Sequence, residues 1–365
     1  MARSTAAVLT AFNQPLEIRE YGVPEQVGEG EVLVRVEMAG ICGTDVHLWK
    51  GELPIPLPNI LGHETVGRIA AIGGAVVDWT GQVLAVGDRI TWASSVVCGE
   101  CFYCRQKGAP TRCVSRKAYG ISYSCAEPPH LRGGYAEYIQ LRRGSSLFKL
   151  PDTLPTEAVI GAGCALNTAI HGLERAPVQW GDTVVIQGSG PVGLAALAVA
   201  KQSGAGKLIV VGGPAHRLVL AREFGADVVI DIDELRTPEE RVQRVLSECG
   251  GYGADSVIEC VGIPAAVNEG LEYCRDGASY LVLGQYANAG NIDFNPHTIT
   301  RKQLRVVGSW AFEHRHVHQA LRMLDECGWK DLFARQVTHR FSLAQANEAL
   351  ETTRRWASGK SVIVP

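Results

Sequence analysis

The densest group of metal-binding side chains in this 365-residue chain is a set of four cysteines. Cys98, Cys101, Cys104 and Cys113 lie within 16 residues and are separated by two, two and eight residues. Four thiolates can surround a tetrahedral Zn²⁺, and a closed shell of this kind is structural because it leaves no position for a substrate. The alternatives are four unconnected buried thiols, or a redox pair of Cys101 and Cys104 without the βαβ context of such motifs.

A second set of metal-binding residue types is spread along the chain. Cys42 lies in the segment GICGTDVH, His63 lies in LGHE, and Cys164 lies in GAGCALNT. Two thiolates and one imidazole bind zinc but leave its fourth position open, as catalytic zinc requires. A buried core thiol is the alternative for Cys164, since cysteine is often buried. The residue types therefore predict a catalytic zinc in addition to the structural one.

A glycine-rich turn indicates a dinucleotide site. Gly188, Gly190 and Gly193 follow the short apolar run 183–186 and precede a stretch rich in Ala, Leu and Val. Glycines at this spacing allow the tight turn, the approach of backbone to pyrophosphate, and close packing of helix on sheet. The helix N-terminus would offer N–H groups to the phosphates. The alternative is a glycine-rich turn without a ligand.

The choice between NAD and NADP depends on the end of the next strand. An acidic residue about 20 positions beyond the glycines usually binds the ribose 2′-hydroxyl of NAD. Residues 211–217 read VGGPAHR and contain no acid. Gly212 leaves room for a 2′-phosphate, and His216 or Arg217 could neutralise it. The segment therefore favours NADP slightly over NAD, and the alternative for Arg217 is a solvated helix residue that contacts only a ribose.

The elements that position these residues divide the chain in two. The first 150 residues contain alternating runs such as Glu31–Val36, typical of half-buried strands. From about Gly181, apolar runs alternate with helical stretches, the first reaching about Ser203 and the second covering residues 217–224. This alternation predicts a parallel sheet with right-handed crossovers. We expect a β-rich domain of residues 1–155 and 300–365 and an α/β domain of residues 156–299.

Composition excludes several classes of protein. The chain is 46% hydrophobic and 20% charged, with a net charge of −3, so a basic surface for nucleic acid or anionic membrane is not expected. No apolar run reaches the roughly 20 residues that span a bilayer, and the first residues do not resemble a secretory signal. We therefore expect a cytoplasmic protein whose 11 cysteines are thiols or metal ligands.

The motifs together resemble the medium-chain, zinc-containing alcohol dehydrogenase family over nearly the full chain. The matching segments are GICGTDVH, GHE, the four-cysteine loop, GGYAEY at 133–138, the glycine-rich turn and the terminal GKSVIV. The resemblance implies a GroES-like catalytic domain and a Rossmann domain with a doubly wound parallel sheet, with the active site in the cleft between them. It implies reversible hydride transfer between an alcohol and NAD(P), and a homodimer or homotetramer.

The resemblance also assigns roles around the catalytic zinc. Cys42, His63 and Cys164 would bind the metal, and Glu64 would be a carboxylate able to approach it. Asp45 would accept a hydrogen bond from the other ring nitrogen of His63 and so fix the ring. The chain departs from the family in the spacing from Cys104 to Cys113, which is one residue longer than usual. The assignment of Cys113 as the fourth ligand of the structural zinc is therefore not settled by the resemblance.

Three further residues would serve proton transfer and cofactor binding in such an enzyme. Thr44 and His47 would pass the alcohol proton to solvent through the cofactor ribose, and Thr168 would lie near the nicotinamide. The alternative for Asp45 and His47 is a simple structural role in a turn.

Other functions remain open at this point. A zinc-free quinone or enoyl reductase of the same fold would not need the Cys/His set, and a non-catalytic nucleotide-binding protein would be expected to have lost it. A zinc hydrolase would leave the glycine-rich turn unexplained. The substrate expected is a small molecule, either a primary alcohol, a secondary alcohol or a polyol, or the corresponding aldehyde or ketone.

Overall fold

In the computed structural model, which describes residues 2–365, the β-rich part of the chain is built around a seven-stranded sheet. Its strands follow the order β10-β6-β5-β3-β18-β17, and β9 also pairs with β3. Their bounds are β3 (Val32–Gly40), β5 (Glu64–Ile72), β6 (Arg89–Trp92), β9 (Tyr138–Leu141), β10 (Leu147–Lys149), β17 (Val337–Phe341) and β18 (Lys360–Ile363).

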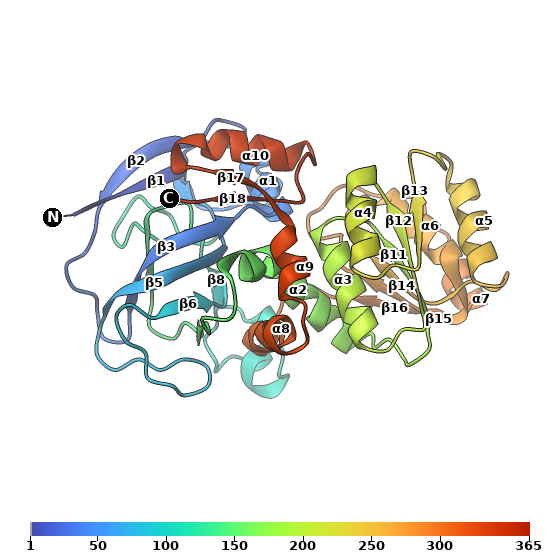
Figure 1. The fold of residues 1–365 in the computed structure, drawn as a ribbon, viewed down its shortest axis with the longest axis horizontal. Coiled ribbons are helices and arrows are strands. Elements are labelled where there is room, and N and C mark those ends of the chain that lie inside the picture. Colours follow the sequence, from blue (N-terminus) through green and yellow to red (C-terminus); the bar gives the residue numbers. More distant parts are fainter. Residues whose placement is uncertain (1) are drawn as a thin grey trace. The chain divides into compact units, whose positions relative to one another are not determined.

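Residues from both ends of the chain meet in this sheet. The last strand, β18, pairs antiparallel with β3 and parallel with β17, and Figure 1 shows these red strands beside the blue β3. The first unit of the structure therefore contains the residues up to Cys164 together with Glu313–Pro365.

Smaller elements complete the first unit. A three-stranded sheet contains β1 (Arg3–Leu9), β2 (Glu17–Gly22) and β4 (Asn59–Ile60), and a two-stranded one contains β7 (Ser95–Val96) and β8 (Lys117–Ala118). The helical segments are α1 (Gly43–Lys50), η1 (Phe102–Gln106), η2 (Pro110–Arg112), α8 (His314–Glu326), α9 (Lys330–Arg335), η3 (Leu343–Gln345) and α10 (Ala346–Arg354).

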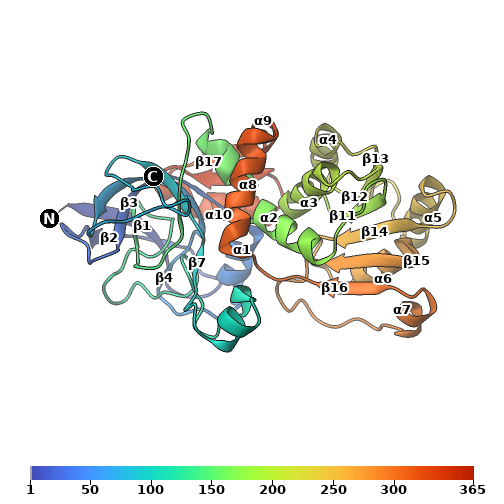
Figure 2. The same ribbon diagram turned by 90° about the horizontal axis from the view of Figure 1, so that it is seen from below.

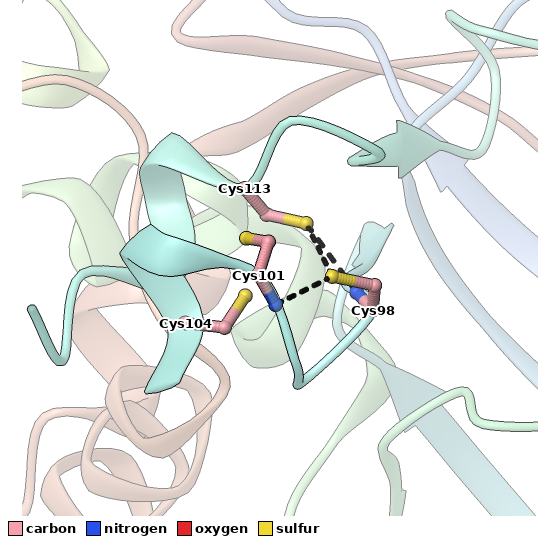
Figure 3. Close-up of side chains that lie close together, drawn as sticks. All are labelled: Cys98, Cys101, Cys104 and Cys113. Atoms are coloured by element: carbon pink, nitrogen blue, oxygen red, sulfur yellow. Dashed lines mark hydrogen bonds between the residues drawn. The ribbon is translucent and has the colours of Figure 1, made fainter. Parts of the chain in front are cut away.

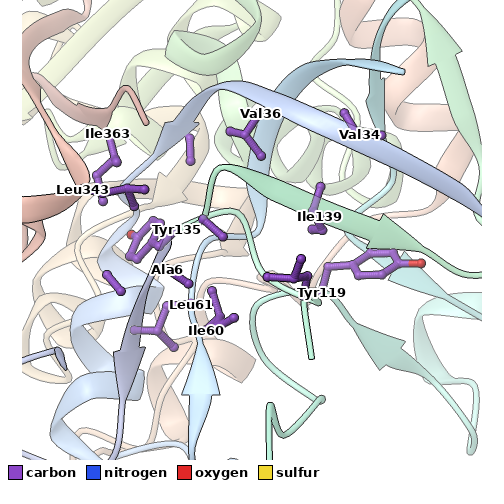
Figure 4. Close-up of a cluster of buried hydrophobic side chains, with 14 of the residues drawn as sticks. Ala6, Val34, Val36, Ile60, Leu61, Tyr119, Tyr135, Ile139, Leu343 and Ile363 are labelled. Carbon is purple, nitrogen blue, oxygen red and sulfur yellow. The ribbon is translucent and has the colours of Figure 1, made fainter. Parts of the chain in front are cut away.

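Alternation along β3 explains how the core of the first unit forms. Val32, Val34 and Val36 share one face of the strand and are all buried, because successive side chains point to opposite faces. On the other face Arg35 is exposed, whereas Leu33 is buried as well. The buried valines join a cluster drawn from many elements, including Ile60 of β4 (Figure 4). Its other labelled members are Ala6, Leu61, Tyr119, Tyr135, Ile139, Leu343 and Ile363.

The second unit, Ala165–Phe312, contains a six-stranded parallel sheet. Its strands are β11 (Thr183–Gln187), β12 (Lys207–Gly212), β13 (Val228–Asp231), β14 (Ala254–Glu259), β15 (Cys274–Val282) and β16 (Arg305–Gly308). Their order, β13-β12-β11-β14-β15-β16, is that of a doubly wound dinucleotide-binding fold. The predicted combination of a β-rich domain with a doubly wound α/β domain is confirmed.

Helices connect these strands and pack on the sheet (Figure 2). They are α3 (Pro191–Gln202), α4 (Ala215–Glu223), α5 (Pro238–Glu248), α6 (Ala265–Tyr273) and α7 (His297–Arg301). The central strand β11 is almost entirely buried, as expected for parallel strands covered on both faces. Among residues 2–365, no helix is long and apolar enough to cross a membrane.

Two borders differ from those expected. Helix α2 (Thr156–Arg175) begins in the first unit and ends in the second. The border between the units therefore lies inside a helix, where the hydrophobic pattern of the sequence shows no break. Residues 300–312, expected in the first domain, belong with the second unit because β16 extends the parallel sheet, pairing Ser279 of β15 with Arg305. The run is short and mostly exposed, so it lacks the apolar signal of the inner strands.

Candidate functional site

Cys42 lies immediately before helix α1 and is its N-cap residue. The backbone N–H of Cys42 donates to Asp45 Oδ2 at 2.8 Å, and the backbone N–H of Asp45 donates to the Cys42 carbonyl at 3.0 Å. These reciprocal bonds satisfy donors that a helix start leaves unpaired. The Cys42 side chain is thus fixed at the start of a rigid element.

Asp45 also connects α1 to His63. Its Oδ1 lies 3.3 Å from His63 Nδ1, and both side chains are buried, at 0% and 5% exposure. Burial lowers the pKa of the His63 imidazole, but the Asp45 carboxylate and Cys42 together outweigh burial and raise it. With Nδ1 facing Asp45, the other ring nitrogen, Nε2, is left for a ligand.

Cys164 reaches the same place from helix α2. Gly163, with φ 43° and ψ −144°, breaks the helical path just before it, a conformation open to glycine and strained for other residues. Cys164 Sγ lies 3.4 Å from Cys42 Sγ, and this contact lowers the pKa of the Cys42 thiol. Single ligand atoms from Cys42, His63, Glu64 and Cys164 all lie within 4.8 Å of one another.

Glu64 is the carboxylate in this group. Its Oε1 accepts the Cys164 N–H at 2.7 Å, and its Oε2 forms a buried ion pair with Lys360 Nζ. Burial raises the pKa of the Glu64 carboxyl, but Lys360, His63 and the Cys164 N–H outweigh burial and lower it to about 2. Glu64 is therefore an anion held from two sides.

Thr44 and His47 lie three positions apart on α1 and so share one face of the helix. The His47 ring Nδ1 contacts Glu52, and these side chains are 38% and 37% exposed. Glu52 also returns to the helix through its backbone N–H, which donates to the His47 carbonyl at 3.0 Å. The hydrogen bond with His47 lowers the pKa of the Glu52 carboxyl.

The four cysteines of the loop 98–113 converge, as Figure 3 shows. The Sγ atoms of Cys98, Cys101, Cys104 and Cys113 lie within 4.8 Å of one another, and those of Cys98 and Cys113 are 3.5 Å apart. Cys113 directly follows η2 and is its C-cap residue, so the longer spacing from Cys104 still places Cys113 with the other three cysteines. Backbone N–H groups of Cys104 and Val114 lower the pKa of Cys101 to about 6.

The glycine-rich turn joins β11 to α3 in the second unit. Gly188 has φ 100°, and a Cβ at Gly193 would lie 1.9 Å from the Gly188 carbonyl oxygen. Gly190 is the N-cap of α3. The turn thus needs glycine at two of these positions for backbone reasons, while at Gly190 the nearest atom to an added Cβ is Arg217 Nη1, at 3.7 Å.

The end of β12 shows why Gly212 is glycine. A Cβ there would lie 2.7 Å from Ser189 Oγ and 2.9 Å from Ser189 N, within the glycine-rich turn. Packing against this turn is therefore sufficient to explain why residue 212 is glycine, and no 2′-phosphate of a cofactor is needed for it. Sequence reasoning missed Asp231, an acid at the end of β13. Asp231 lies opposite Gly212 in the parallel sheet, and this position follows only from the register of β12 and β13.

His216 and Arg217 lie in the first turn of α4, as Ala215 begins this helix. Partial burial and the neighbouring Arg217 charge lower the pKa of the His216 imidazole, which makes it a poor cation. Burial also lowers the pKa of Arg217, but a guanidinium stays charged in proteins. Thr168 lies one turn after Cys164 on α2.

The structure brings together the Cys42, His63 and Cys164 set and, separately, the four-cysteine set, both in the first unit. The glycine-rich turn and its neighbours belong to the second unit. Sequence reasoning also missed two partners of the site residues. Lys360 lies 296 positions from Glu64, and no local signal connects them, whereas Glu52, five positions after His47, could have been found by proximity.

Comparison with known proteins gives the same pattern. The model of the alcohol dehydrogenase GroES-like domain matches residues 28–152, and that of the zinc-binding dehydrogenase matches residues 191–326. A 5-exo-hydroxycamphor dehydrogenase of Pseudomonas putida is 36% identical over 369 aligned residues, covering 100% of this chain and 99% of the relative.

Two solved structures are similar over the whole chain. An alcohol dehydrogenase from Thermotoga maritima has a TM-score of 0.94 and 35% identity, covering 100% of both chains. A structure described as a zinc-binding dehydrogenase, from Sinorhizobium meliloti 1021 and bound to NADP, has a TM-score of 0.85 and 29% identity, again covering 100% of both chains.

Proposed function

Because the chain belongs to the zinc-type, medium-chain alcohol dehydrogenase family, we propose that it catalyses reversible hydride transfer between an alcohol and a nicotinamide cofactor. The single observation that carries this proposal is the convergence of Cys42, His63 and Cys164, with the two sulfurs 3.4 Å apart. Two thiolates and one imidazole form a known ligand set of alcohol dehydrogenase zinc.

The donor atoms fit such a metal. Two sulfurs that each lie about 2.3 Å from a tetrahedral zinc are about 3.8 Å apart, close to the 3.4 Å between Cys42 and Cys164. His63 presents Nε2 because its Nδ1 faces Asp45. Zinc bound there would act as a Lewis acid that lowers the pKa of an alcohol hydroxyl, and the nicotinamide would accept the hydride.

The chain's own residues would handle the proton. The Thr44 hydroxyl, two positions after the ligand Cys42, would accept the proton that leaves the alcohol oxygen. His47, one helical turn further on and 38% exposed, would deliver it to solvent by way of the cofactor ribose. Asp45 would hold the His63 ring in the orientation that binds metal.

We assign the four-cysteine loop to a second, structural zinc. Sulfurs of Cys98 and Cys113 are 3.5 Å apart, which again agrees with a tetrahedral metal. Four thiolates leave no position for a substrate, so this metal would stabilise the loop and take no part in hydride transfer.

For the cofactor, the proposal keeps a slight preference for NADP over NAD. Gly188, Gly190 and Gly193 would receive the pyrophosphate at the start of α3, and Thr168 would lie near the nicotinamide. Arg217, close to Gly190, is a better partner for a 2′-phosphate than His216, and the Sinorhizobium relative is bound to NADP. Asp231 beside Gly212 favours NAD, which keeps the preference small.

The substrate proposed is a small alcohol, whether primary, secondary or polyol. The camphor-related relative is named for a secondary alcohol on a bicyclic ring, so cyclic secondary alcohols belong in a first panel with linear alcohols and polyols. A homodimer or homotetramer is the assembly expected in this family.

One experiment tests the function as a whole. Purified protein is assayed for zinc and for reduction of NAD and NADP with a panel of alcohols, followed by absorbance of the reduced nicotinamide. About two zinc ions per chain and alcohol-dependent reduction are expected. Quinone or enone reduction without zinc at the Cys42, His63 and Cys164 set would indicate the zinc-free reductase. Zinc without any turnover would indicate a non-catalytic protein.

A further inference from the structure

Lys360, the first residue of β18, is buried although it carries a positive charge. Its side chain is 2% exposed, and its Nζ forms an ion pair with Glu64, whose side chain is 1% exposed. Burying two charges is costly, and removing one partner leaves the other uncompensated. We therefore ask what the pair of Lys360 and Glu64 contributes to the residues around it.

Two glycines make the space for this ion pair. A Cβ at Gly40 would lie 2.7 Å from Glu64 Oε2 and 3.0 Å from Lys360 Cε. A Cβ at Gly163 would lie 2.4 Å from Glu64 Oε1 and 3.0 Å from Lys360 Nζ. Any other residue at either position would displace the pair, so β3, α2 and β18 all accommodate it.

The ion pair acts on the candidate zinc ligands through Glu64. One carboxylate oxygen holds the backbone N–H of Cys164, at 2.7 Å, and the other holds Lys360. A Glu64 oxygen also lies within 4.8 Å of the ligand atoms of Cys42, His63 and Cys164. Glu64 is thus close enough to compete for a metal and is restrained on both oxygens.

The charges around Glu64 indicate why Lys360 is needed. The thiolates of Cys42 and Cys164 and the carboxylates of Glu64 and Asp45 carry four negative charges, and a divalent cation balances two of them. Lys360 balances one more, and it does so directly at the Glu64 carboxylate. Without it, the carboxylate would be an uncompensated buried anion beside a cation, and carboxylate oxygen is an accepted zinc ligand.

We propose that Lys360 is a positioning residue that keeps Glu64 out of zinc coordination, so that the fourth position stays free for the alcohol. This inference rests on the proposed function and adds the residue that protects its open position. Lys360 itself would touch neither zinc nor substrate.

The test uses Lys360→Met, which keeps the length of the side chain and removes its charge, with Lys360→Arg as the conservative control. The catalytic metal is exchanged for Co²⁺, and the visible spectrum is recorded, because its bands report coordination number and ligands independently of turnover. In Lys360→Met the spectrum should change to that of a site with an added oxygen ligand, and kcat/KM should fall about 10–100-fold. Lys360→Arg should restore both.

A second pair of variants covers the case in which Lys360→Met does not fold. Glu64→Gln and the double variant Glu64→Gln with Lys360→Met contain no unpaired buried carboxylate. If Lys360 acts through Glu64, both should give the same cobalt spectrum. A difference between them, or a Lys360→Met spectrum identical to that of the unmodified protein, would overturn the inference.

The two proposals fail in different ways. If the unmodified protein bound neither Zn²⁺ nor Co²⁺ at this site and oxidised no alcohol, the proposed function would fail. If it did both and Lys360→Met left the cobalt spectrum unchanged, only the role of Lys360 would be lost.

Discussion

At the scale of single residues, each candidate ligand of the catalytic zinc has a neighbour that is not itself assigned to the metal. Asp45 lies against both the Cys42 backbone and the His63 ring, and Glu64 holds the backbone of Cys164. Neighbours that orient metal ligands commonly matter almost as much as the ligands. Asp45 and Glu64 are therefore placed to orient the three ligands.

Removing a ligand should abolish turnover without removing the cofactor. We expect Cys42→Ala and His63→Ala to lower the zinc content from about two to about one ion per chain and to reduce NADP binding little, because the glycine-rich turn lies in the other unit. Metal analysis and nicotinamide fluorescence check this. Cys125→Ala, a buried thiol outside both sets, is the control; near-normal activity in both ligand variants would refute the metal assignment.

His47 gives a second prediction at this scale. Replacement of a positioned acid–base group commonly costs about 10²–10⁴-fold in rate. We expect His47→Ala to slow alcohol oxidation by about 100-fold at lower pH, where hydroxide is scarce, and by less at higher pH. The measurement is kcat/KM across the pH range, and a profile that keeps the shape seen in the unmodified protein would rule the relay out.

Residue types and spacing were sufficient to predict the four-cysteine set, which lies in one short segment, whereas the set of Cys42, His63 and Cys164 is spread over three segments and was predicted from its residue types and from the family resemblance. They could not reveal Lys360 as the partner of Glu64, because this contact exists only once β18 has joined β3. They also could not show that Gly212 packs on Ser189. This packing alone explains the glycine, which the sequence had connected with a 2′-phosphate.

At the scale of elements, the glycine-rich turn places β11 and α3 in close contact. Gly193 contacts the Gly188 carbonyl so closely that even a methyl group has no room. The apolar run and the glycine spacing predicted this strand–turn–helix unit correctly, because the backbone itself imposes the glycines. The kink of α2 at Gly163 could not be predicted, as glycine within a helical pattern has several explanations.

Gly193→Ala tests the packing of this turn. Overpacking of this kind commonly costs about 1–3 kcal/mol, so we expect the second unit to lose about that much stability and NADP affinity to fall because α3 must shift. Gly308→Ala is the matched control, since a Cβ there meets nothing within 4 Å. Denaturant unfolding and cofactor titration measure both effects; equal behaviour of the two variants would show that the turn tolerates a side chain.

At the scale of the whole molecule, the chain leaves the first unit within α2 and returns to it at Glu313. The change of pattern near Gly181 was sufficient to predict two domains of different class. The return was harder to locate, because β16 has an exposed, weakly apolar sequence that only its pairing with β15 identifies as part of the parallel sheet.

The four-cysteine loop gives a prediction for the stability of the molecule. Structural zinc contributes directly to folding free energy, so Cys101→Ser should remove one zinc and lower the melting temperature of the first unit. For a unit of this size, a loss of about 2 kcal/mol corresponds to roughly 4–8 °C. Calorimetry should show this drop in Cys101→Ser, and an unchanged melting temperature after loss of the metal would contradict a structural role.

The place of β18 between β3 and β17 also sets the order in which the molecule can mature on the ribosome. The second unit is one continuous stretch of the chain, Ala165–Phe312. The first unit must wait, with β3 lacking one neighbour, until residues 360–363 have been translated. The ion pair of Lys360 with Glu64, which lies beside the candidate zinc ligands, can therefore form only after β18 has joined β3.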